Sequence, residues 1–394
     1  MEKEGERRWR LATRCVRWRG EPDPTTGALV SPIHQTSAFA FESVAQIQQY
    51  LKDDASHYIY TRYGNPTLEE AERKLSALEG AEEAVLFASG QAATTAAILS
   101  VLRAGDEILS VANIYGGTYR LFTQLLPNFG ITTRFFRPQE VDHLDTLTSG
   151  RTRMIFIESP TNPTLEILDL SSVAASANRA GVLLAADNTF ATPCNQSPLN
   201  LGADMVIHSA TKYLGGHSDL IAGAVMGPSD RMRALRETMI VTGGCADPFA
   251  AFLLLRGLKT LAARMRVHNE NAAGVAAYLA SHPRARSVRY PGLETHPGHA
   301  VARRQMRGFG GLVTFEVDGG FDGACRVMDR FRLFLRAATL GGVESNAMLP
   351  VLASHAGYSD EELSIAGVTR AMIRLSVGIE DLEDLLEDLE QALS

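Results

Sequence analysis

The feature that most constrains this chain is a regular alternation of helical stretches and short apolar runs between residues 66 and 209. Each run has five or six residues and is apolar on both faces. Such runs, separated by helices, are typical of a mostly parallel sheet covered on both sides. The six predicted strands are Ala84–Ala88, Glu107–Val111, Ile131–Phe136, Met154–Glu158, Val182–Asp187 and Met205–Ser209.

Helix signals frame these strands and continue beyond them. Helices are predicted at Pro66–Leu78 and, in an alanine-rich stretch, at Ala92–Leu102. Beyond the sheet the sequence predicts one long helix at Ala250–Ala273, a strand at Gly311–Val317 and an amphipathic last helix at Glu380–Leu393. We therefore expect an N-terminal arm over 1–62, a large α/β domain over 63–255 and a smaller α+β domain over 256–394.

Length, charge and cysteine usage narrow the class of protein. A chain of 394 residues is too long for one small core, and its net charge of −7 argues against a nucleic-acid partner. The four cysteines form no CxxC pair, so we expect reduced thiols in a cytoplasmic enzyme. No apolar stretch is long enough to span a bilayer, and the arginine-rich N-terminus lacks the hydrophobic segment of a secretory signal. No membrane partner is expected.

Polar residues follow several of the predicted strands, at the edge where parallel sheets bind ligands. Asp187 ends one strand and Lys212 follows another, 25 positions later. A pyridine cofactor needs both residue types, because an aspartate keeps the ring nitrogen protonated and a lysine holds the cofactor covalently. The pair alone leaves both a functional and a structural interpretation open.

The neighbouring residues supply further parts of such a site. The hydroxyls of Ser209 and Thr211 flank the lysine, and Gly90 and Gln91 open a helix whose free N–H groups can bind a phosphate. Tyr115, next to two glycines, could stack on a pyridine ring. An ordinary strand-to-helix turn at Gly90 and a core tyrosine at 115 are the structural alternatives.

Longer motifs carry a family resemblance over nearly all of the sequence. The protein resembles the Cys/Met-metabolism enzymes that depend on pyridoxal 5′-phosphate (PLP): cystathionine γ-synthase, cystathionine γ-lyase, methionine γ-lyase and their sulfhydrylase relatives. The motifs are EPDPTTGA at 21–28, YTRYGNPT at 60–67, SGQAA at 89–93, YGGTYR at 115–120, ESPTNPT at 158–164, DNTFATP at 187–193, SATKYLGGHSD at 209–219, LRGLKTLAARM at 255–265, YPGL...HPGH at 290–299, LGGVES at 340–345 and IRLSVGIED at 373–381.

The resemblance implies an aspartate aminotransferase-like fold, fold type I of the PLP-dependent enzymes, and a role for each matching residue. Lys212 would bind PLP covalently, Asp187 would partner the ring nitrogen, and Tyr115 would stack on the ring and help to protonate the leaving sulfur. The phosphate would be held by Gly90, Gln91, Ser209 and Thr211, and from the neighbouring subunit of a homotetramer, a dimer of dimers, by Tyr60 and Arg62. The substrate carboxylate would be bound by Asn162, Thr339 and Arg374, since arginine makes two parallel bonds to a carboxylate.

The implied reaction is γ-elimination, which breaks the C–S or C–O bond in the side chain of a sulfur amino acid or homoserine ester. Replacement by a thiol, as in a γ-synthase or sulfhydrylase, and β-cleavage of cystathionine stay open. Three departures from the family pattern bear on the substrate. Ala338 stands where γ-synthases and γ-lyases usually have glutamate, and Gly117 where methionine γ-lyases usually have cysteine. Asn346-Ala347-Met348 replaces the more apolar run that is usual after Glu-Ser.

Other interpretations fit the sequence less well. An aminotransferase would share the fold and cofactor but not the long sulfur-family motifs, and a non-catalytic relative would be expected to lose Lys212 or Asp187. A metal site at His296 and His299 lacks an accompanying acid or cysteine cluster, so a structural loop is favoured and no metal is expected. The basic N-terminus is interpreted as a subunit contact or solvated arm through Arg8, Arg10, Arg14, Arg17 and Arg19.

Overall fold

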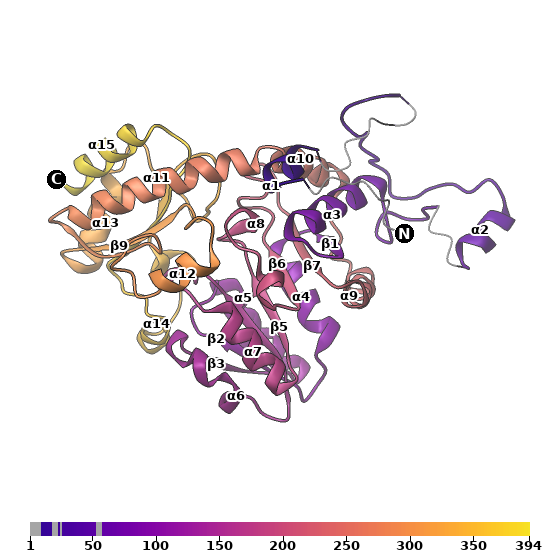
Figure 1. Cartoon of the computed structure of the whole chain (residues 1–394), viewed down its shortest axis with the longest axis horizontal. Helices are drawn as coiled ribbons and strands as arrows, with labels where there is room; N and C mark the ends of the chain where they lie inside the picture. The colour runs from indigo at the N-terminus through magenta and orange to yellow at the C-terminus, as the bar shows by residue number, and fades with distance from the viewer. Residues whose placement is uncertain (1–8, 18–22, 24–25, 53–56) are drawn as a thin grey trace.

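The computed structural model describes residues 9–17, 23, 26–52 and 57–394, and places two β-sheets side by side with helices around them (Figure 1). Arg8, Arg19 and part of the 21–28 motif lie outside the described residues. Within the described part, no helix is both long enough and apolar enough to cross a membrane.

The larger sheet has seven strands in the order β1-β7-β6-β5-β4-β2-β3. Its strands are β1 (Glu83–Phe87), β2 (Glu107–Val111), β3 (Thr132–Phe136), β4 (Thr152–Glu158), β5 (Leu183–Asp187), β6 (Met205–His208) and β7 (Gly223–Gly227). All six predicted strands are present, each within two residues of its predicted bounds. The sheet is parallel from β6 to β3, whereas β7, which was not predicted, pairs antiparallel with both β1 and β6.

Helices cover the sheet on both sides and account for the apolar character of its strands. The α-helices among the described residues are α1 (Leu11–Arg17), α2 (Val44–Tyr50), α3 (Pro66–Glu79), α4 (Gly90–Val101), α5 (Gly116–Arg120), α6 (Leu144–Leu147), α7 (Leu170–Ala180), α8 (Thr192–Asn195), α9 (Ser229–Thr242), α10 (Pro248–Leu258), α11 (Leu261–Ser281), α12 (His299–Gln305), α13 (Gly320–Arg330), α14 (Asp360–Ile365) and α15 (Leu382–Leu393). Both predicted N-terminal helices are confirmed: Asn65 caps α3, which ends at the left-handed Gly80, and Ser89 caps α4.

The single long helix predicted at Ala250–Ala273 is wrong, because the backbone breaks there into α10 and α11. The break follows Gly257, which packs directly against the backbone of Gly215, so that a Cβ at 257 would collide with it. Arg264 then bonds the Gly257 carbonyl from the next helix, at 2.9 Å. Tertiary contacts therefore interrupt a stretch whose composition favours helix throughout.

The smaller sheet has five strands in the order β10-β11-β12-β9-β8 and belongs to the C-terminal part of the protein. Its strands are β8 (Ala285–Arg289), β9 (Leu312–Val317), β10 (Leu335–Arg336), β11 (Asn346–Met348) and β12 (Met372–Ser376). The predicted strand at 311–317 is confirmed as β9, and the predicted last helix as α15, whose leucine stripe packs into the core of this sheet.

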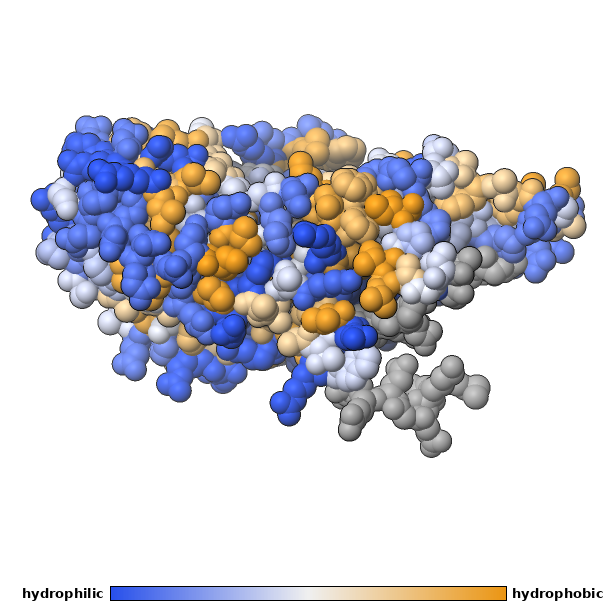
Figure 2. All heavy atoms as spheres, turned by 90° about the horizontal axis from the view of Figure 1, so that it is seen from above, coloured by the Kyte–Doolittle hydropathy of each residue, from blue (hydrophilic) through white to orange (hydrophobic). Residues whose placement is uncertain are grey.

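The described N-terminal segment consists of α1 and a separate stretch that contains α2. Helix α1 itself packs on α3 and α11 of the same subunit, with Cys15 fully buried. The following stretch, with α2, extends away from the sheets (Figure 1). It exposes large apolar side chains, among them Leu29, Val44 and Leu51, and Figure 2 shows apolar surface on both the arm and the adjoining body.

Candidate active site

A continuous series of hydrogen bonds links both sheets at the carboxyl edge of the larger one. Lys212, which follows β6, donates from Nζ to Oγ1 of Thr339 at 3.1 Å. The carbonyl of Thr339 accepts from Nη2 of Arg374 at 3.0 Å, and Nη1 of Arg374 donates to Oδ1 of Asn162, also at 3.0 Å. Four predicted site residues, from segments far apart in sequence, thus meet at one place.

Burial and charge tune the lysine and the arginine of this hydrogen-bonded series. Burial, with a smaller contribution from the cation of Arg374, lowers the pKa of Lys212 to about 8. Burial likewise lowers the pKa of Arg374 to about 10. The Nε atom of Arg374 is buried without a protein partner, so the guanidinium has a hydrogen-bond donor to spare.

Asp187 ends β5, next to β6, which leads to the lysine. Its Oδ1 accepts from the N–H of Thr189 at 2.9 Å, and its side chain is only half-buried. Burial raises the pKa of the Asp187 carboxyl, while the Thr189 hydrogen bonds and the imidazole of His208 oppose that rise. A cation placed against this carboxylate would oppose it further.

The N-terminus of α4 lies against the residues that precede the lysine. A Cβ added to Gly90 would stand 2.8 Å from Cβ of Ser209, so only glycine permits this approach. The first N–H groups of α4 have no intrahelical partner, and the Ser209 hydroxyl has no hydrogen-bond partner among the described residues. The Thr211 hydroxyl, in contrast, is bonded to the backbone of Ala222.

Tyr115 occupies the N-cap position of α5, makes no capping hydrogen bond with its side chain, and is 46% exposed. Its ring folds back over Gly117, where a Cβ would stand 2.5 Å from Cε1 of the ring. The side chain of Gln91 donates to the Gly117 carbonyl at 3.1 Å and accepts from the Thr118 hydroxyl at 3.2 Å. Gln91 therefore ties the tyrosine-bearing turn to the N-terminus of α4.

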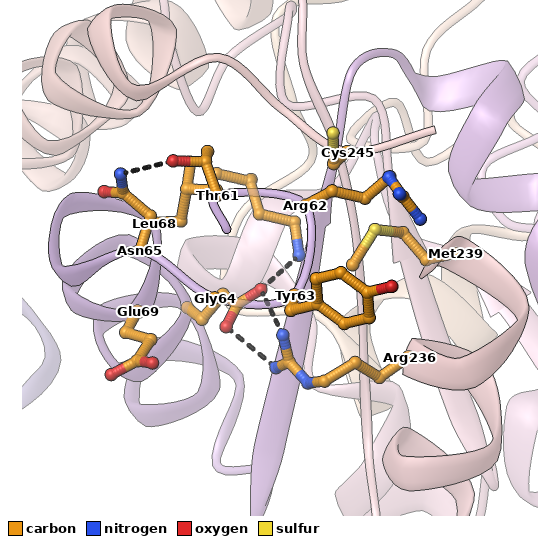
Figure 3. A pocket seen from close by; sticks show the side chains of 12 residues that line it. Thr61, Arg62, Tyr63, Gly64, Asn65, Leu68, Glu69, Arg236, Met239 and Cys245 are labelled. Atoms are coloured by element: carbon orange, nitrogen blue, oxygen red, sulfur yellow. Dashed lines mark hydrogen bonds and ion pairs between the residues drawn. The ribbon is translucent and has the colours of Figure 1, made fainter. Parts of the chain in front are cut away.

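Tyr60 and Arg62 do not join this cluster within one subunit. Arg62 donates to the carbonyl of Ile240 at 2.8 Å and lies beside the rings of Tyr60 and Tyr63. It lines a small cavity together with Arg236, Met239 and Cys245, in which an ion pair holds α9 to α3 (Figure 3).

Three residues at the same edge received no role from the sequence. Glu158 ends β4 and is buried beside Asp187, Thr189 hydrogen-bonds Asp187, and His208 is buried with its Nε2 2.5 Å from a carboxylate oxygen of Glu79. Only Glu158 gave a signal that could have found it, since it ends its strand as Asp187 does. His296 and His299 lie elsewhere and bond the backbone of their own loop.

These groups fit PLP, the cofactor that the sequence resemblance implies. The free helix N–H groups and the unpartnered Ser209 hydroxyl offer donors to a phosphate, and the close approach at Gly90 leaves the donors uncovered. The half-buried carboxylate of Asp187 suits a protonated ring nitrogen, and the amine of Lys212 can attach an aldehyde once it is neutral. Each of these side chains keeps part of its surface accessible.

Comparisons with known proteins agree with this arrangement. The family model described as Cys/Met metabolism PLP-dependent enzyme matches residues 12–394. The protein is 41% identical to a cystathionine γ-lyase of Dictyostelium discoideum over 98% of both sequences. It is 40% identical to an L-methionine γ-lyase of Fusobacterium nucleatum over 93% of its own length and 94% of that relative. The solved structure of a cystathionine γ-synthase from Xanthomonas oryzae, in complex with aminoacrylate and cysteine, superposes with a TM-score of 0.92 at 39% identity, covering 98% of both proteins.

Proposed function

Since this protein belongs to the Cys/Met metabolism family of PLP-dependent enzymes, we propose that it is a lyase acting by γ-elimination. The proposed substrate is a sulfur amino acid or a homoserine ester, in which a C–S or C–O bond beyond the β carbon is cleaved. The fold is that of the PLP-dependent enzymes of transsulfuration, and PLP is the cofactor. The observation that carries the proposal is the hydrogen-bonded series from Lys212 through Thr339 and Arg374 to Asn162.

The proposed binding roles follow from the donors and acceptors present. Arg374, with its spare Nε donor, and Asn162 bind the substrate carboxylate, and the Thr339 hydroxyl lies beside the lysine amine. The N-terminus of α4 at Gly90 and Gln91, with the hydroxyls of Ser209 and Thr211, holds the phosphate. For the Thr211 hydroxyl this requires sharing or giving up its bond to Ala222.

The proposed chemical roles rest on three side chains. Bound PLP supplies an electron sink conjugated with the substrate Cα, and Asp187 maintains it by holding a proton on the ring nitrogen. The amine of Lys212, whose pKa burial lowers to about 8, takes the proton from Cα of the substrate. Once the Lys212 amine has passed this first proton to the bound cofactor, it would take a second proton from Cβ, and the exposed phenol of Tyr115 would donate a proton to the sulfur or oxygen that departs from Cγ.

The assembly is also part of the proposal. Tyr60 and Arg62 are remote from Lys212 within one subunit, and they stand where the arm rejoins the body. We propose that they bind the phosphate of the neighbouring subunit in a homotetramer built as a dimer of dimers, whose contacts bury the exposed apolar side chains of the arm. Arm, large domain and small domain are divided as 1–62, 63–255 and 256–394, and a cytoplasmic location is proposed.

A second candidate function is γ-replacement, in which a thiol adds after the leaving group departs. It is favoured by the likeness to the Xanthomonas cystathionine γ-synthase at a TM-score of 0.92. The two functions use the same residues for proton transfer and differ in what reaches Cγ afterwards, so the products of the purified enzyme separate them.

The test is product identity from the purified enzyme with PLP. L-methionine, L-homocysteine, L-cystathionine and O-acylhomoserines are offered, the esters with and without cysteine, and the Lys212→Ala protein is the control. 2-Oxobutanoate and ammonia establish γ-elimination, whereas a thioether formed only with cysteine establishes γ-replacement. Pyruvate from cystathionine shows β-cleavage instead, and full turnover by Lys212→Ala contradicts the proposed role of the lysine.

A further inference from the structure

Glu158 is a buried acid at the centre of the candidate site for which the proposed function has no use. It is the last residue of β4 and is 4% exposed. In the parallel pairing of β4 with β5 it stands directly opposite Asp187, so the two side chains leave the sheet on the same face. Its position is therefore as close to the ring-nitrogen partner as the sheet allows.

Glu158 makes one direct contact with a proposed catalytic residue, through that residue's backbone. Its Oε2 accepts from the N–H of Tyr115 at 2.9 Å. Tyr115 is the N-cap of α5, and its own side chain does not cap the helix. The hydrogen bond from the Tyr115 N–H to Glu158 thus holds the backbone from which the tyrosine ring turns back over Gly117.

Burial and the neighbouring charges of Asp187 and Arg374 determine whether the Glu158 carboxyl is protonated. Burial, and then the carboxylate of Asp187, raise the pKa of Glu158 well above its usual range, against the smaller opposing effects of the Tyr115 hydrogen bond and Arg374. Two carboxylates on neighbouring strand ends do not both ionise readily with one guanidinium nearby. Because Asp187 must be negative to partner a protonated ring nitrogen, Glu158 is the one that stays neutral.

We propose that Glu158 is a positioning residue, which fixes Tyr115 over the cofactor site by accepting its backbone N–H and leaves Asp187 as the one negative carboxylate there. The inference rests on the proposed function for the roles of Tyr115 and Asp187. The contact itself is independent of those roles. To hold the Tyr115 N–H, a neutral acid at this position needs only an acceptor oxygen and no negative charge.

A pair of variants of similar volume separates acceptor from charge. Glu158→Gln keeps an acceptor oxygen and is neutral, whereas Glu158→Met fills the same space without any acceptor oxygen. Glu107→Met is the control for burial, since Glu107 is as little exposed as Glu158 but stands at the opposite end of the sheet, where it is bonded to Ser149 and Thr152 and ion-paired with Arg134 and Arg151. It reports the general effect of losing a buried glutamate.

Two measurements are made on each variant. Hydrogen–deuterium exchange of the peptide 112–120 is followed without PLP, and kcat and KM are measured with PLP on the best substrate of the panel. Glu158→Gln is expected within about threefold of the wild type in both. Glu158→Met is expected to exchange the Tyr115 amide about tenfold faster and to lose about tenfold in kcat with KM little changed, because the Tyr115 N–H loses its acceptor. Glu107→Met is expected to lower the melting temperature while leaving exchange at Tyr115 unchanged.

The outcomes that overturn the inference are distinct from failure of the proposed function. If Glu158→Met protects the Tyr115 amide as the wild type does, Glu158 does not position the tyrosine. If Glu158→Gln is as impaired as Glu158→Met, the negative charge is what matters and the neutral acid is refuted. The exchange measurement requires neither cofactor nor substrate, so it stands even where the substrate panel yields no product.

Discussion

The lowered proton affinity of Lys212 leads to a prediction about how fast the protein takes up its cofactor. Only a neutral amine attacks the aldehyde of PLP. With a pKa of about 8 in place of the ordinary 10.5, roughly one Lys212 in ten is neutral at pH 7, against roughly one in three thousand for a free lysine. At pH 7 the Lys212 amine is therefore expected to be in the neutral, reactive form about 300-fold more often than a lysine with the ordinary pKa.

The assay uses protein from which PLP has been removed. PLP is added between pH 6 and pH 10.5, and the rate of attachment is followed by the absorbance of the bound cofactor. Nα-acetyl-lysine is measured in parallel, so that the titration of PLP itself cancels in the ratio. The protein's rate is expected to rise with pH and to level off above about pH 8, while the rate of the model amine continues to rise toward pH 10.5.

Replacing Arg374 by methionine separates the two causes of the lowered pKa. Burial is the larger cause and the cation of Arg374 the smaller, so the midpoint is expected to move upward in Arg374→Met yet remain below 10.5. A wild-type midpoint near 10 would refute the reasoning, because Lys212 would then be solvated. A downward movement in Arg374→Met would refute the part assigned to the arginine.

Two further predictions test local strain and the shared site. Gly216→Ala is expected to cost about 3 kcal/mol of stability, because Gly216 has φ +75° and a Cβ there would collide with the buried guanidinium of Arg264. Gly243→Ala, with φ +77° and no neighbour within 4 Å, is expected to cost only about 1 kcal/mol. Both losses are measured as the free energy of unfolding in denaturant, and equal losses would contradict the collision at 216. Arg62→Ala and Lys212→Ala are each expected to lose activity, and refolding them together should restore about a quarter of it if the site is shared, since half the dimers are mixed and hold one intact site. No recovery would place Arg62 outside the neighbouring site.

The strands of the large sheet could be predicted because the signals that define them lie within short stretches of sequence. Strands such as Glu107–Val111 are buried on both faces, so every residue in them is apolar or bonded, and turns with glycine or proline separate them from the helices. The edge at which Asp187 and Lys212 meet follows from the parallel order alone. Strand β7 was missed because the glycines and alanine of Gly223-Ala224-Val225-Met226-Gly227 carry little strand propensity. Glycine is required at 223 by close packing against the backbone of Ser89, and at 227 by the backbone of Asp204.

What the sequence could not give is set by contacts between distant segments. The break between α10 and α11 depends on Gly215, some forty positions earlier, and the meeting of Thr339 with Lys212 depends on how the two sheets lie against each other. Glu158 is part of a well-recognised motif, yet its contact with Tyr115 crosses from one strand end to the next turn and has no signature in spacing. Conversely, Thr211 looks free in the sequence, although its hydroxyl is bonded to Ala222.

The charge of Arg374 affects the pKa of Lys212 differently before and after substrate binds. Before substrate binds, its cation helps burial to keep the pKa of Lys212 low, which favours the neutral amine that attaches the cofactor. Under the proposed roles, a substrate carboxylate that pairs with Arg374 neutralises this cation, and the pKa of the released Lys212 amine then rises. A stronger base is what removal of the Cα proton requires. The same guanidinium, buried with an unpartnered Nε, would thus favour attachment in the free enzyme and proton abstraction once a carboxylate is bound.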